Sequence, residues 1–306
     1  MSGNTSRGKL IVRWLSSLVG IVAIVVYFAW QSPAGFFEKG LHVDLLWLAC
    51  GFFFYGVFLI LSTIRWGNLL SADPTILPWK DLTIVTLIAK GLGSITPMNA
   101  GEFYKAELSH RILSDGRGSQ YGIVAVERVV DVSTLLLCAS IGIFTQPKLR
   151  IYFADKVPFV IGIVIVTIAI GIASLYFAVR FSPKLRSLYN GMTGAFRLLW
   201  IRKSILPLTI LLWLSIAVMW WTLAAAFHAN VSFSDALLIM SITTFIIVGS
   251  FIPGGLGIAD IGATQIGIWL GYPPMQAFLF PLAIRANTFI SLLYGVLGWF
   301  LRQLKK

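Results

Sequence analysis

Several runs of apolar residues are long enough to cross a lipid bilayer, and they constrain this chain more than any other feature. About 20 predominantly apolar residues span the hydrocarbon core of a membrane. Hydrophobic residues make up 58% of the sequence and charged residues only 12%, whereas about a quarter of the residues in soluble domains are charged. Residues 1–306 are therefore predicted to form a single integral membrane domain of the all-α, polytopic class. The expected full spans are 11–30, 43–64, 121–145, 157–179, 205–228 and 275–301.

Basic residues between the spans indicate the orientation, because cytoplasmic loops carry an excess of Lys and Arg. The connector 180–204 holds six such residues and no acid, so we expect it in the cytoplasm. Both termini are basic and are expected there too, in a protein of the cytoplasmic membrane. The loop 147–156 is also basic but must lie outside, and we treat it as the weaker signal. This bias and attraction to anionic lipid explain the net charge of +12, so no nucleic-acid partner is expected.

Two further apolar segments, 82–113 and 236–272, are interrupted by proline and glycine. Irregular backbone at membrane depth is tolerated only where protein buries it or where it lines a wet cavity. With six full spans and both termini inside, each interrupted segment must enter and leave on one side. We therefore predict two re-entrant broken-helix hairpins, the first entering from the cytoplasm and the second from outside. The residues expected to break the helices are Pro97, Gly101, Pro253, Gly254, Gly255 and Gly257.

The two breaks share a spacing. Each reads Pro-x-x-x-Gly, at 97–101 and at 253–257, and an arginine follows each proline at nearly the same distance: Arg128 after 31 residues and Arg285 after 32. This pattern predicts an inverted-topology repeat, which is typical of transporters and places the binding site near the membrane midplane. The alternative is that glycine and proline only permit tight hairpins and close packing. The expected repeat units are about 82–145 and 236–301.

Glu127, Arg128 and Asp131 lie inside an expected span and share one face of its helix. A charge at the bilayer centre costs about 2.5–3.5 kcal/mol on insertion scales, so the three must face a partner or a cavity. Either they bind a ligand or they form a self-compensating cluster that fixes helix packing. Arg285 has no acid within a turn of its own helix. It is expected to bind a phosphate or carboxylate, unless its partner is Asp260 across the hairpin.

Glu102 and Asp260 each follow a break within one turn, where an acid stabilises a helix N-terminus. Capping is the favoured interpretation for Asp260. For Glu102, which has Lys105 one turn later, capping and a cavity-facing carboxylate both stay open. Lys90 is a further cation that could line the cavity, and the unpaired N–H groups after each break could hold an anion. The candidate substrate-binding residues are Asn99, Glu102, Lys105, Glu127, Arg128, Asp131, Asp260, Arg285 and Asn287.

The sequence carries no GxxxxGK[ST] nucleotide-binding motif, no HExxH, no GxSxG and no Cys/His cluster. No cofactor, metal or catalytic residue is therefore expected. Cys50 and Cys138 lie in apolar surroundings and are interpreted as small core residues. An enzyme built on this chain would have to use intramembrane carboxylates, with Glu102 or Glu127 as general base.

In three short motifs the sequence resembles the lysylphosphatidylglycerol synthase transmembrane-region family, whose flippase-like membrane domains occur alone or fused to soluble enzymes. The resemblance extends over nearly the whole chain. Two positions depart from the family pattern: Lys105, where arginine is common, and Asp260, where glutamate is common. The motifs are Pro97-x-x-x-Gly101-Glu102, Glu127-Arg128-x-x-Asp131 and Pro253-Gly254-Gly255-Leu256-Gly257-x-x-Asp260.

The resemblance implies transbilayer movement of an amphiphile with a polar, often phosphate-bearing head. In fused members a synthase domain makes aminoacylated phosphatidylglycerol, but no segment here is polar enough for that domain, so lipid aminoacylation is not expected. The expected partner is a membrane lipid, either a phospholipid or a polyisoprenoid-phosphate-linked one, held by Arg128 and Arg285 in a cavity open to the bilayer. Envelope-biosynthesis enzymes are further candidate partners. The alternatives are a secondary transporter of a small soluble anion, a membrane-embedded transferase, and an accessory subunit of surface-lipid or polysaccharide assembly.

Overall fold

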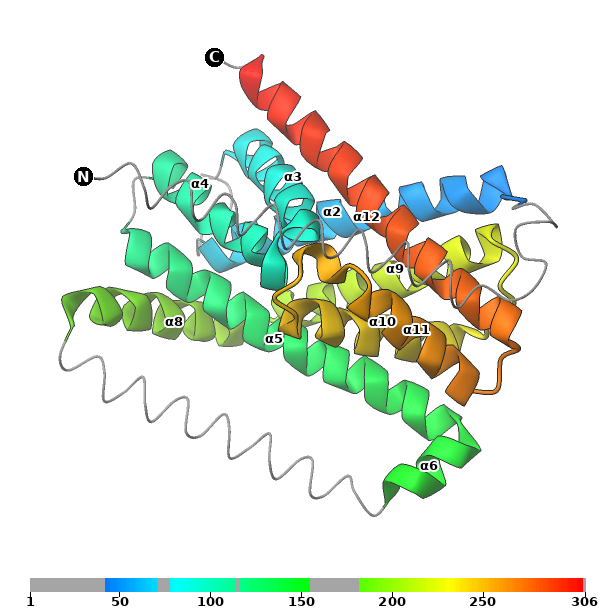
Figure 1. The fold of residues 1–306 in the computed structure, drawn as a ribbon. Helices are drawn as coiled ribbons and strands as arrows, with labels where there is room; N and C mark the ends of the chain where they lie inside the picture. The colour runs from blue at the N-terminus through cyan, green and yellow to red at the C-terminus, as the bar shows by residue number, and fades with distance from the viewer. Residues whose placement is uncertain (1–41, 71–77, 114–115, 155–181, 305–306) are drawn as a thin grey trace, which may run out of the picture.

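The computed structural model describes residues 42–70, 78–113, 116–154 and 182–304, and within these ranges all regular structure is helical (Figure 1). The all-α class is therefore confirmed. The expected spans 11–30 and 157–179 lie outside the described residues. The helices are α2 (Leu45–Leu70), α3 (Trp79–Ile95), η2 (Pro97–Glu102), α4 (Phe103–Leu113), α5 (Arg117–Thr145), α6 (Pro147–Ala154), α8 (Pro183–Ile201), α9 (Ile205–Ala226), α10 (Phe233–Gly249), η3 (Pro253–Gly255), α11 (Ile258–Trp269) and α12 (Pro274–Gln303).

Three of these helices are long and apolar enough to cross a membrane: α2 with 26 residues, α9 with 22 and α12 with 30. They coincide with the expected spans 43–64, 205–228 and 275–301. The helix α5 has 29 residues and occupies the expected span 121–145. At 1.5 Å per residue it is about 43 Å long, more than the roughly 30 Å of a hydrocarbon core. The chain is a multi-pass membrane protein.

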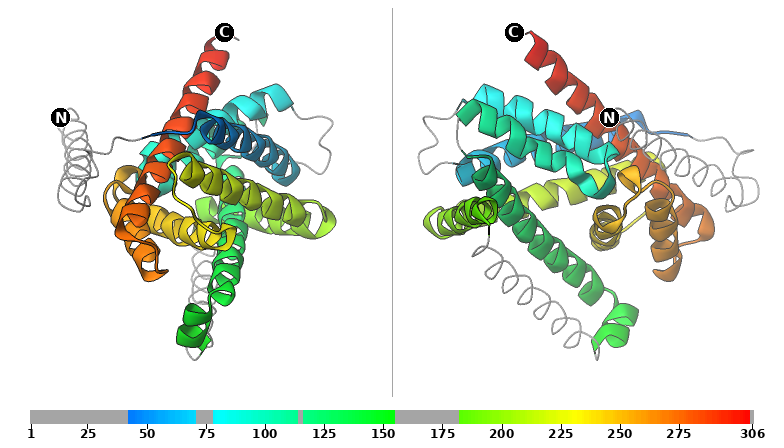
Figure 2. Two further views of the ribbon diagram at one scale, coloured as in Figure 1. Left: turned by 90° about the vertical axis from the view of Figure 1, so that its right-hand side faces the viewer. Right: turned by 60° about the vertical axis from the view of Figure 1, so that its left-hand side comes forward.

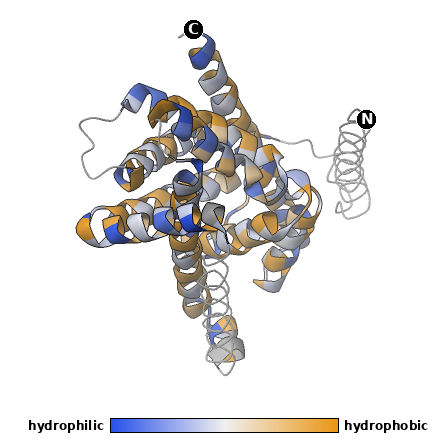
Figure 3. Cartoon of the chain, turned by 90° about the vertical axis from the view of Figure 1, so that its left-hand side faces the viewer, coloured by the Kyte–Doolittle hydropathy of each residue, from blue (hydrophilic) through white to orange (hydrophobic). Residues whose placement is uncertain are grey.

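Hydrophobic residues occur along the long helices (Figure 3), and many of their large side chains are exposed. Phe53 on α2 is 67% exposed, Leu211 on α9 is 53% exposed and Val296 on α12 is 64% exposed. Soluble monomers rarely expose such side chains in large contiguous patches. In a bilayer these side chains contact lipid tails, so the surface agrees with a membrane environment.

The helices pack in three main pairs: α2 with α9, α3 with α12, and α5 with α8 (Figures 1 and 2). Glycines allow close approach in two of these pairs, as is common between membrane helices. A Cβ atom on Gly91 would lie 2.6 Å from the Cα of Gly295, and one on Gly191 would lie 2.2 Å from the carbonyl oxygen of Ser119. The sequence predicted 180–204 only as a basic connector. In the structure this connector contains the 19-residue helix α8, which packs on α5.

Two parts of the chain have the same order and nearly the same lengths of elements. The helices α3 and α10 both have 17 residues, α4 has 11 and α11 has 12, and α5 has 29 and α12 has 30. A break separates the first two helices in each part. Arg128 and Arg285 are each the twelfth residue of their helix, counted from Arg117 and from Pro274. These elements run from 79 to 145 and from 233 to 303, so they overlap the predicted repeat units 82–145 and 236–301 and extend two or three residues beyond them.

Candidate functional site

The first break, η2, holds its backbone in conformations that most residues avoid. Met98 and Asn99 both have a φ of 54°, in the left-handed region, which costs a non-glycine residue on the order of 1–3 kcal/mol. The N–H of Gly101 donates to the hydroxyl of Thr96 at 2.7 Å. A Cβ atom on Gly101 would lie 2.2 Å from the backbone nitrogen of Gly93. Glycine is therefore required for the chain to fold back this closely on α3.

The second break, η3, uses glycines for the same purpose. Gly254, Gly255 and Gly257 have φ values of 58°, 61° and 81°, which glycine adopts without strain. A Cβ atom on Gly254 would lie 2.6 Å from the carbonyl oxygen of Ser94 on α3. The second break therefore packs directly on the helix that leads into the first.

The two breaks are in contact with each other. The backbone N–H of Met98 donates to the carbonyl oxygen of Ser250 at 3.1 Å, and η2 packs against η3 and α10 near the middle of the molecule (Figure 1). The interrupted segments thus come together at one junction. All the residues predicted to break them lie in or beside it: Pro97, Gly101, Pro253, Gly254, Gly255 and Gly257.

Arg285 finds its partner within the chain. Its Nη2 lies 2.6 Å from Oδ2 of Asp260 and its Nε lies 2.9 Å from Oδ1, a two-point fork of the kind that favours Arg–carboxylate pairs. Asp260 is fully buried and also accepts the backbone N–H of Gly257 at 2.8 Å. The capping role favoured for Asp260 is therefore present in the structure. Asp260, which was considered as the alternative partner of Arg285, is the partner observed.

Glu127 and Asp131 are held by an arginine from another helix. Arg65 on α2 lies 2.8 Å from Glu127 and 2.5 Å from Asp131, and Lys105 on α4 lies 2.9 Å from Glu127. Arg128 pairs with Asp131 at 3.1 Å. The hypothesis that Glu127, Arg128 and Asp131 compensate one another is therefore wrong for Glu127, whose charge is neutralised from α2 and α4. Arg65 was missed because it directly follows the expected span 43–64 and resembles an interfacial cation.

Glu102 contacts three cations. Its carboxylate lies 2.7 Å from Lys90, 3.5 Å from Arg128 and 3.7 Å from Lys105. Of the two interpretations left open for Glu102, the structure shows the cavity-facing carboxylate, because Glu102 and Lys90 both line the cavity described below. These contacts join Glu102 to the acids on α5. The charge cluster is defined here as Arg65, Lys90, Glu102, Lys105, Glu127, Arg128 and Asp131.

The charge cluster is not electrically balanced. Among the described residues it contains four basic and three acidic side chains, which leaves a formal excess of one positive charge when all are ionised. A buried charge without a counter-ion is strongly unfavourable. Arg128 is the most accessible member, with a side chain 26% exposed, and its Nε is buried without a hydrogen-bond partner among the described residues. Arg128 is therefore the member of the charge cluster that is most open to a ligand.

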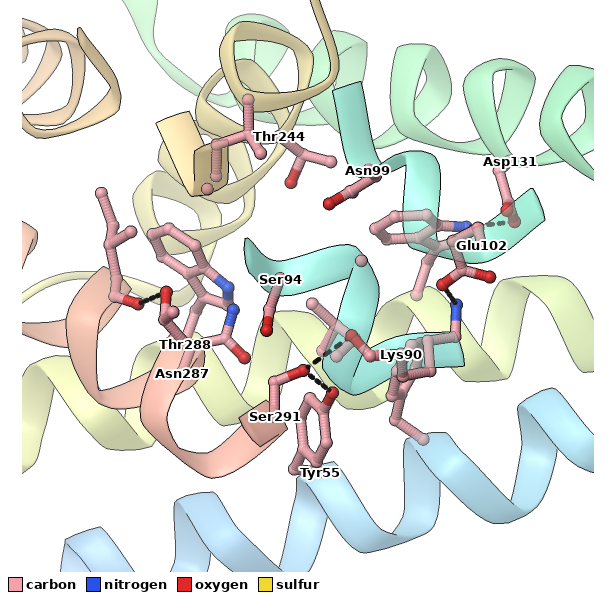
Figure 4. Close-up of a pocket in the computed structure, with 18 of the residues that line it drawn as sticks. Tyr55, Lys90, Ser94, Asn99, Glu102, Asp131, Thr244, Asn287, Thr288 and Ser291 are labelled. Carbon is pink, nitrogen blue, oxygen red and sulfur yellow. Dashed lines mark hydrogen bonds and ion pairs between the residues drawn. The ribbon is translucent and has the colours of Figure 1, made fainter. Parts of the chain in front are cut away.

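A cavity of about 130 Å³ lies where the breaks meet α2, α5, α9 and α12 (Figure 4). Its charged lining consists of members of the charge cluster: Lys90, Glu102, Arg128 and Asp131. Neutral polar side chains form a second part, and these are Tyr55, Ser94, Asn99, Thr244, Asn287, Thr288 and Ser291. Large apolar side chains form the third, namely Phe58, Leu212, Trp213, Ile216, Trp220, Ile247 and Ile284. The cavity can therefore contact charged, polar and apolar parts of one ligand.

The cavity gathers some of the predicted substrate-binding residues and leaves others out. Asn99, Glu102, Arg128, Asp131 and Asn287 line it. Lys105 and Glu127 lie behind them in the charge cluster, with side chains that are fully buried. Arg285 and Asp260 form the separate pair described above and are not among the lining residues. The expectation that Arg128 and Arg285 share one ligand in this cavity is therefore not met, because the guanidinium of Arg285 is ion-paired with Asp260.

Comparison with known families identifies the chain. The family described as the lysylphosphatidylglycerol synthase TM region matches residues 14–295. The chain belongs to this family. No curated protein and no solved structure matches it. Membership of the lysylphosphatidylglycerol synthase TM region family indicates a membrane function related to lipids, and the junction, the charge cluster and the cavity all lie within the matched residues.

Proposed function

We propose that this protein moves a lipid with an anionic, phosphate-bearing head group across the cytoplasmic membrane, and that the head group binds in the cavity at Arg128. The observation that carries the proposal is the single positive charge in excess in the charge cluster. An anionic head group would neutralise it. Arginine suits this task, because its guanidinium binds phosphate in a fork and keeps its charge.

The mixed lining of the cavity favours an amphiphile over a small soluble anion. Phe58, Trp220 and Ile247 face the same space as Lys90 and Arg128. A phosphate ion would make no use of these apolar side chains, whereas a lipid can place the start of its tail against them. This arrangement supports lipid as the transported molecule.

We propose that the chain forms an inverted-topology repeat whose two re-entrant hairpins enter from opposite sides of the membrane. The matching helix lengths and the twelfth-position arginines support a repeat, and the Met98–Ser250 hydrogen bond supports hairpins that meet tip to tip. In such an architecture broken helices hold the substrate near the midplane. The termini and the connector 180–204 would lie in the cytoplasm.

The test is head-group exchange in reconstituted vesicles. Phosphatidylglycerol labelled on an acyl chain is incorporated with the purified protein, and an impermeant reductant bleaches the label in the outer leaflet. Wild-type protein is expected to let bleaching continue into the inner-leaflet pool. Arg128→Gln should slow this phase at least about tenfold, the effect of losing a charge-assisted hydrogen bond. Arg111→Gln removes an exposed cation from α4, outside the cavity, and is the matched control.

Two results would contradict the proposal. One is bleaching that stops with the outer leaflet for wild-type protein. The other is equal exchange by wild-type protein and Arg128→Gln. Uptake of labelled inorganic phosphate by the same vesicles, without lipid exchange, would favour the soluble-anion transporter instead.

A further inference from the structure

The cavity has two chemically different walls. The charged wall comes from the first repeat unit and consists of Lys90, Glu102, Arg128 and Asp131. The neutral wall comes from the second repeat unit and consists of Thr244, Asn287, Thr288 and Ser291. Lys90, Glu102 and Asp131 lie on one side of the cavity, and Thr244, Asn287 and Thr288 lie on the other (Figure 4).

Corresponding helix positions supply the two walls. Lys90 is the twelfth residue of α3, and Thr244 is the twelfth residue of α10. Asp131 and Thr288 each follow the twelfth residue of their own helix by three positions. A charge on one side thus corresponds to a hydroxyl on the other. The two walls present different chemistry on a common framework.

The two threonine hydroxyls of the neutral wall offer a ligand acceptors, because their own protons are already used. Thr244 and Thr288 already donate their protons to main-chain carbonyl oxygens, at 2.7 and 3.0 Å. Ser291 is hydrogen-bonded to the carbonyl oxygen of Lys90 at 3.2 Å and to the hydroxyl of Tyr55 at 2.5 Å. Each hydroxyl oxygen keeps a lone pair after donating its proton. A ligand group that faces Thr244 and Thr288 must therefore bring its own donor.

Asn287 also needs a hydrogen-bond donor from the ligand, because its side-chain oxygen finds none in the described part of the chain. Its Oδ1 is buried and has no hydrogen-bond partner among the described residues, and the side chain lines the cavity. A buried acceptor without a donor is unfavourable, and a ligand donor relieves that cost. The opposite wall has the complementary need, because the buried Nε of Arg128 is a donor that lacks an acceptor.

We propose that the neutral wall, through Asn287, selects phosphate head groups that carry a neutral hydrogen-bond donor beyond the phosphate, such as a hydroxyl. The inference rests on the proposed function and adds a specificity-determining residue to it. The phosphate lies at Arg128 on the charged wall. The substituent beyond it points to the neutral wall and donates to Asn287 Oδ1.

A hydroxyl fits this wall better than an ammonium group. The carboxylates that line the cavity, Glu102 and Asp131, both belong to the charged wall and are bound by cations of the protein. The charge cluster already has one positive charge in excess, so an ammonium group would add to the imbalance. A hydroxyl group supplies the required O–H donor without adding a charge.

The experiment compares two acyl-labelled lipids in the reconstituted exchange assay. Phosphatidylglycerol and phosphatidylmethanol carry the same single negative charge, but phosphatidylmethanol ends in a methyl group and has no donor beyond its phosphate. Wild-type protein is expected to exchange phosphatidylglycerol about tenfold faster, which matches one buried acceptor left unpaired. In Asn287→Leu this ratio should fall toward one. Asn190→Leu, on the exposed face of α8, is the matched control and should keep the wild-type ratio.

A ratio near one for wild-type protein overturns the inference and leaves the proposed function standing. A ratio that Asn287→Leu preserves overturns the assignment to Asn287. If neither lipid exchanges, the proposed function fails and the inference fails with it. If vesicles instead take up soluble glycerol phosphate without exchanging lipid, the neutral wall recognises the hydroxyl of a soluble substrate. The assignment to a lipid is then overturned.

Discussion

Arg65 on α2 and Asp131 on α5 form an ion pair of 2.5 Å, and both side chains are at most 5% exposed. The same guanidinium holds Glu127 at 2.8 Å. One acid that lines the cavity, Asp131, and one that lies behind it, Glu127, are therefore held by the same arginine of α2. Removing one partner of a buried pair leaves an uncompensated charge, which is far more unfavourable than losing the pair altogether.

Arg65→Ala should destabilise the protein by about 3–5 kcal/mol, because Glu127 and Asp131 would each lose their closest cation and keep only Lys105 and Arg128, respectively. Thermal unfolding of the purified protein in detergent measures the effect as a lowered melting temperature. Arg186→Ala, which removes an exposed cation from α8, should change stability by less than about 0.5 kcal/mol. Equal melting temperatures for the two variants would show that the buried pairs do not support the fold.

Arg285→Met should also lower stability, because it leaves the fully buried Asp260 without a cation. The double variant Arg285→Met with Asp260→Asn should be more stable than the single one. Asparagine is neutral and can still cap the helix at Gly257, a contribution of about 1 kcal/mol. The melting temperatures of both variants test this order. A double variant less stable than Arg285→Met would contradict the account of this pair.

Gly254→Ala should disrupt the junction of the breaks. The new Cβ atom would lie 2.6 Å from the carbonyl oxygen of Ser94, and the φ of 58° is unfavourable for alanine. We expect a lower melting temperature together with slower lipid exchange. Gly249→Ala is the matched control, because a Cβ atom there meets nothing within 4 Å. A Gly254→Ala protein that melts like Gly249→Ala would argue against a tightly packed junction.

The ends of α9 should lie on opposite sides of the membrane. Ser204 and Asn230 are exposed just before and just after this helix. In a background with Cys50→Ala and Cys138→Ala, Asn230→Cys should react with an impermeant thiol reagent added to intact cells. Ser204→Cys should react only after the membrane is permeabilised. The reverse pattern would invert the proposed orientation.

Much of the fold could be predicted because its signals are local. Apolar runs indicated α2, α9 and α12, and the Pro-x-x-x-Gly spacing located both breaks before any contact was known. The matched distances to Arg128 and Arg285 also followed from spacing alone. α8 was not anticipated as a helix that packs on α5, because its basic residues mask its apolar face in a hydropathy profile.

The site was harder to predict, because its contacts join distant parts of the chain. Arg65 meets Glu127 across 62 positions, and no local pattern links them. Arg285 was expected at the ligand because its own helix offers it no acid. Its actual partner, Asp260, lies on α11, and the turn between α11 and α12 brings the two side chains within reach of each other. Of the neutral wall only Asn287 was a candidate, since Thr244 and Thr288 are ordinary residues of apolar helices.

The central claim is that the positive charge in excess in the charge cluster binds an anionic head group. The most direct measurement is the affinity of purified protein in detergent for acyl-labelled phosphatidylglycerol, read by fluorescence anisotropy. Removing one carboxylate with Glu102→Gln raises the excess to two charges, and removing one cation with Arg128→Gln reduces it to zero. The account predicts the order Glu102→Gln, then wild type, then Arg128→Gln, with about tenfold or more between the last two. Equal affinities for all three proteins, or weaker binding by Glu102→Gln than by Arg128→Gln, would contradict it.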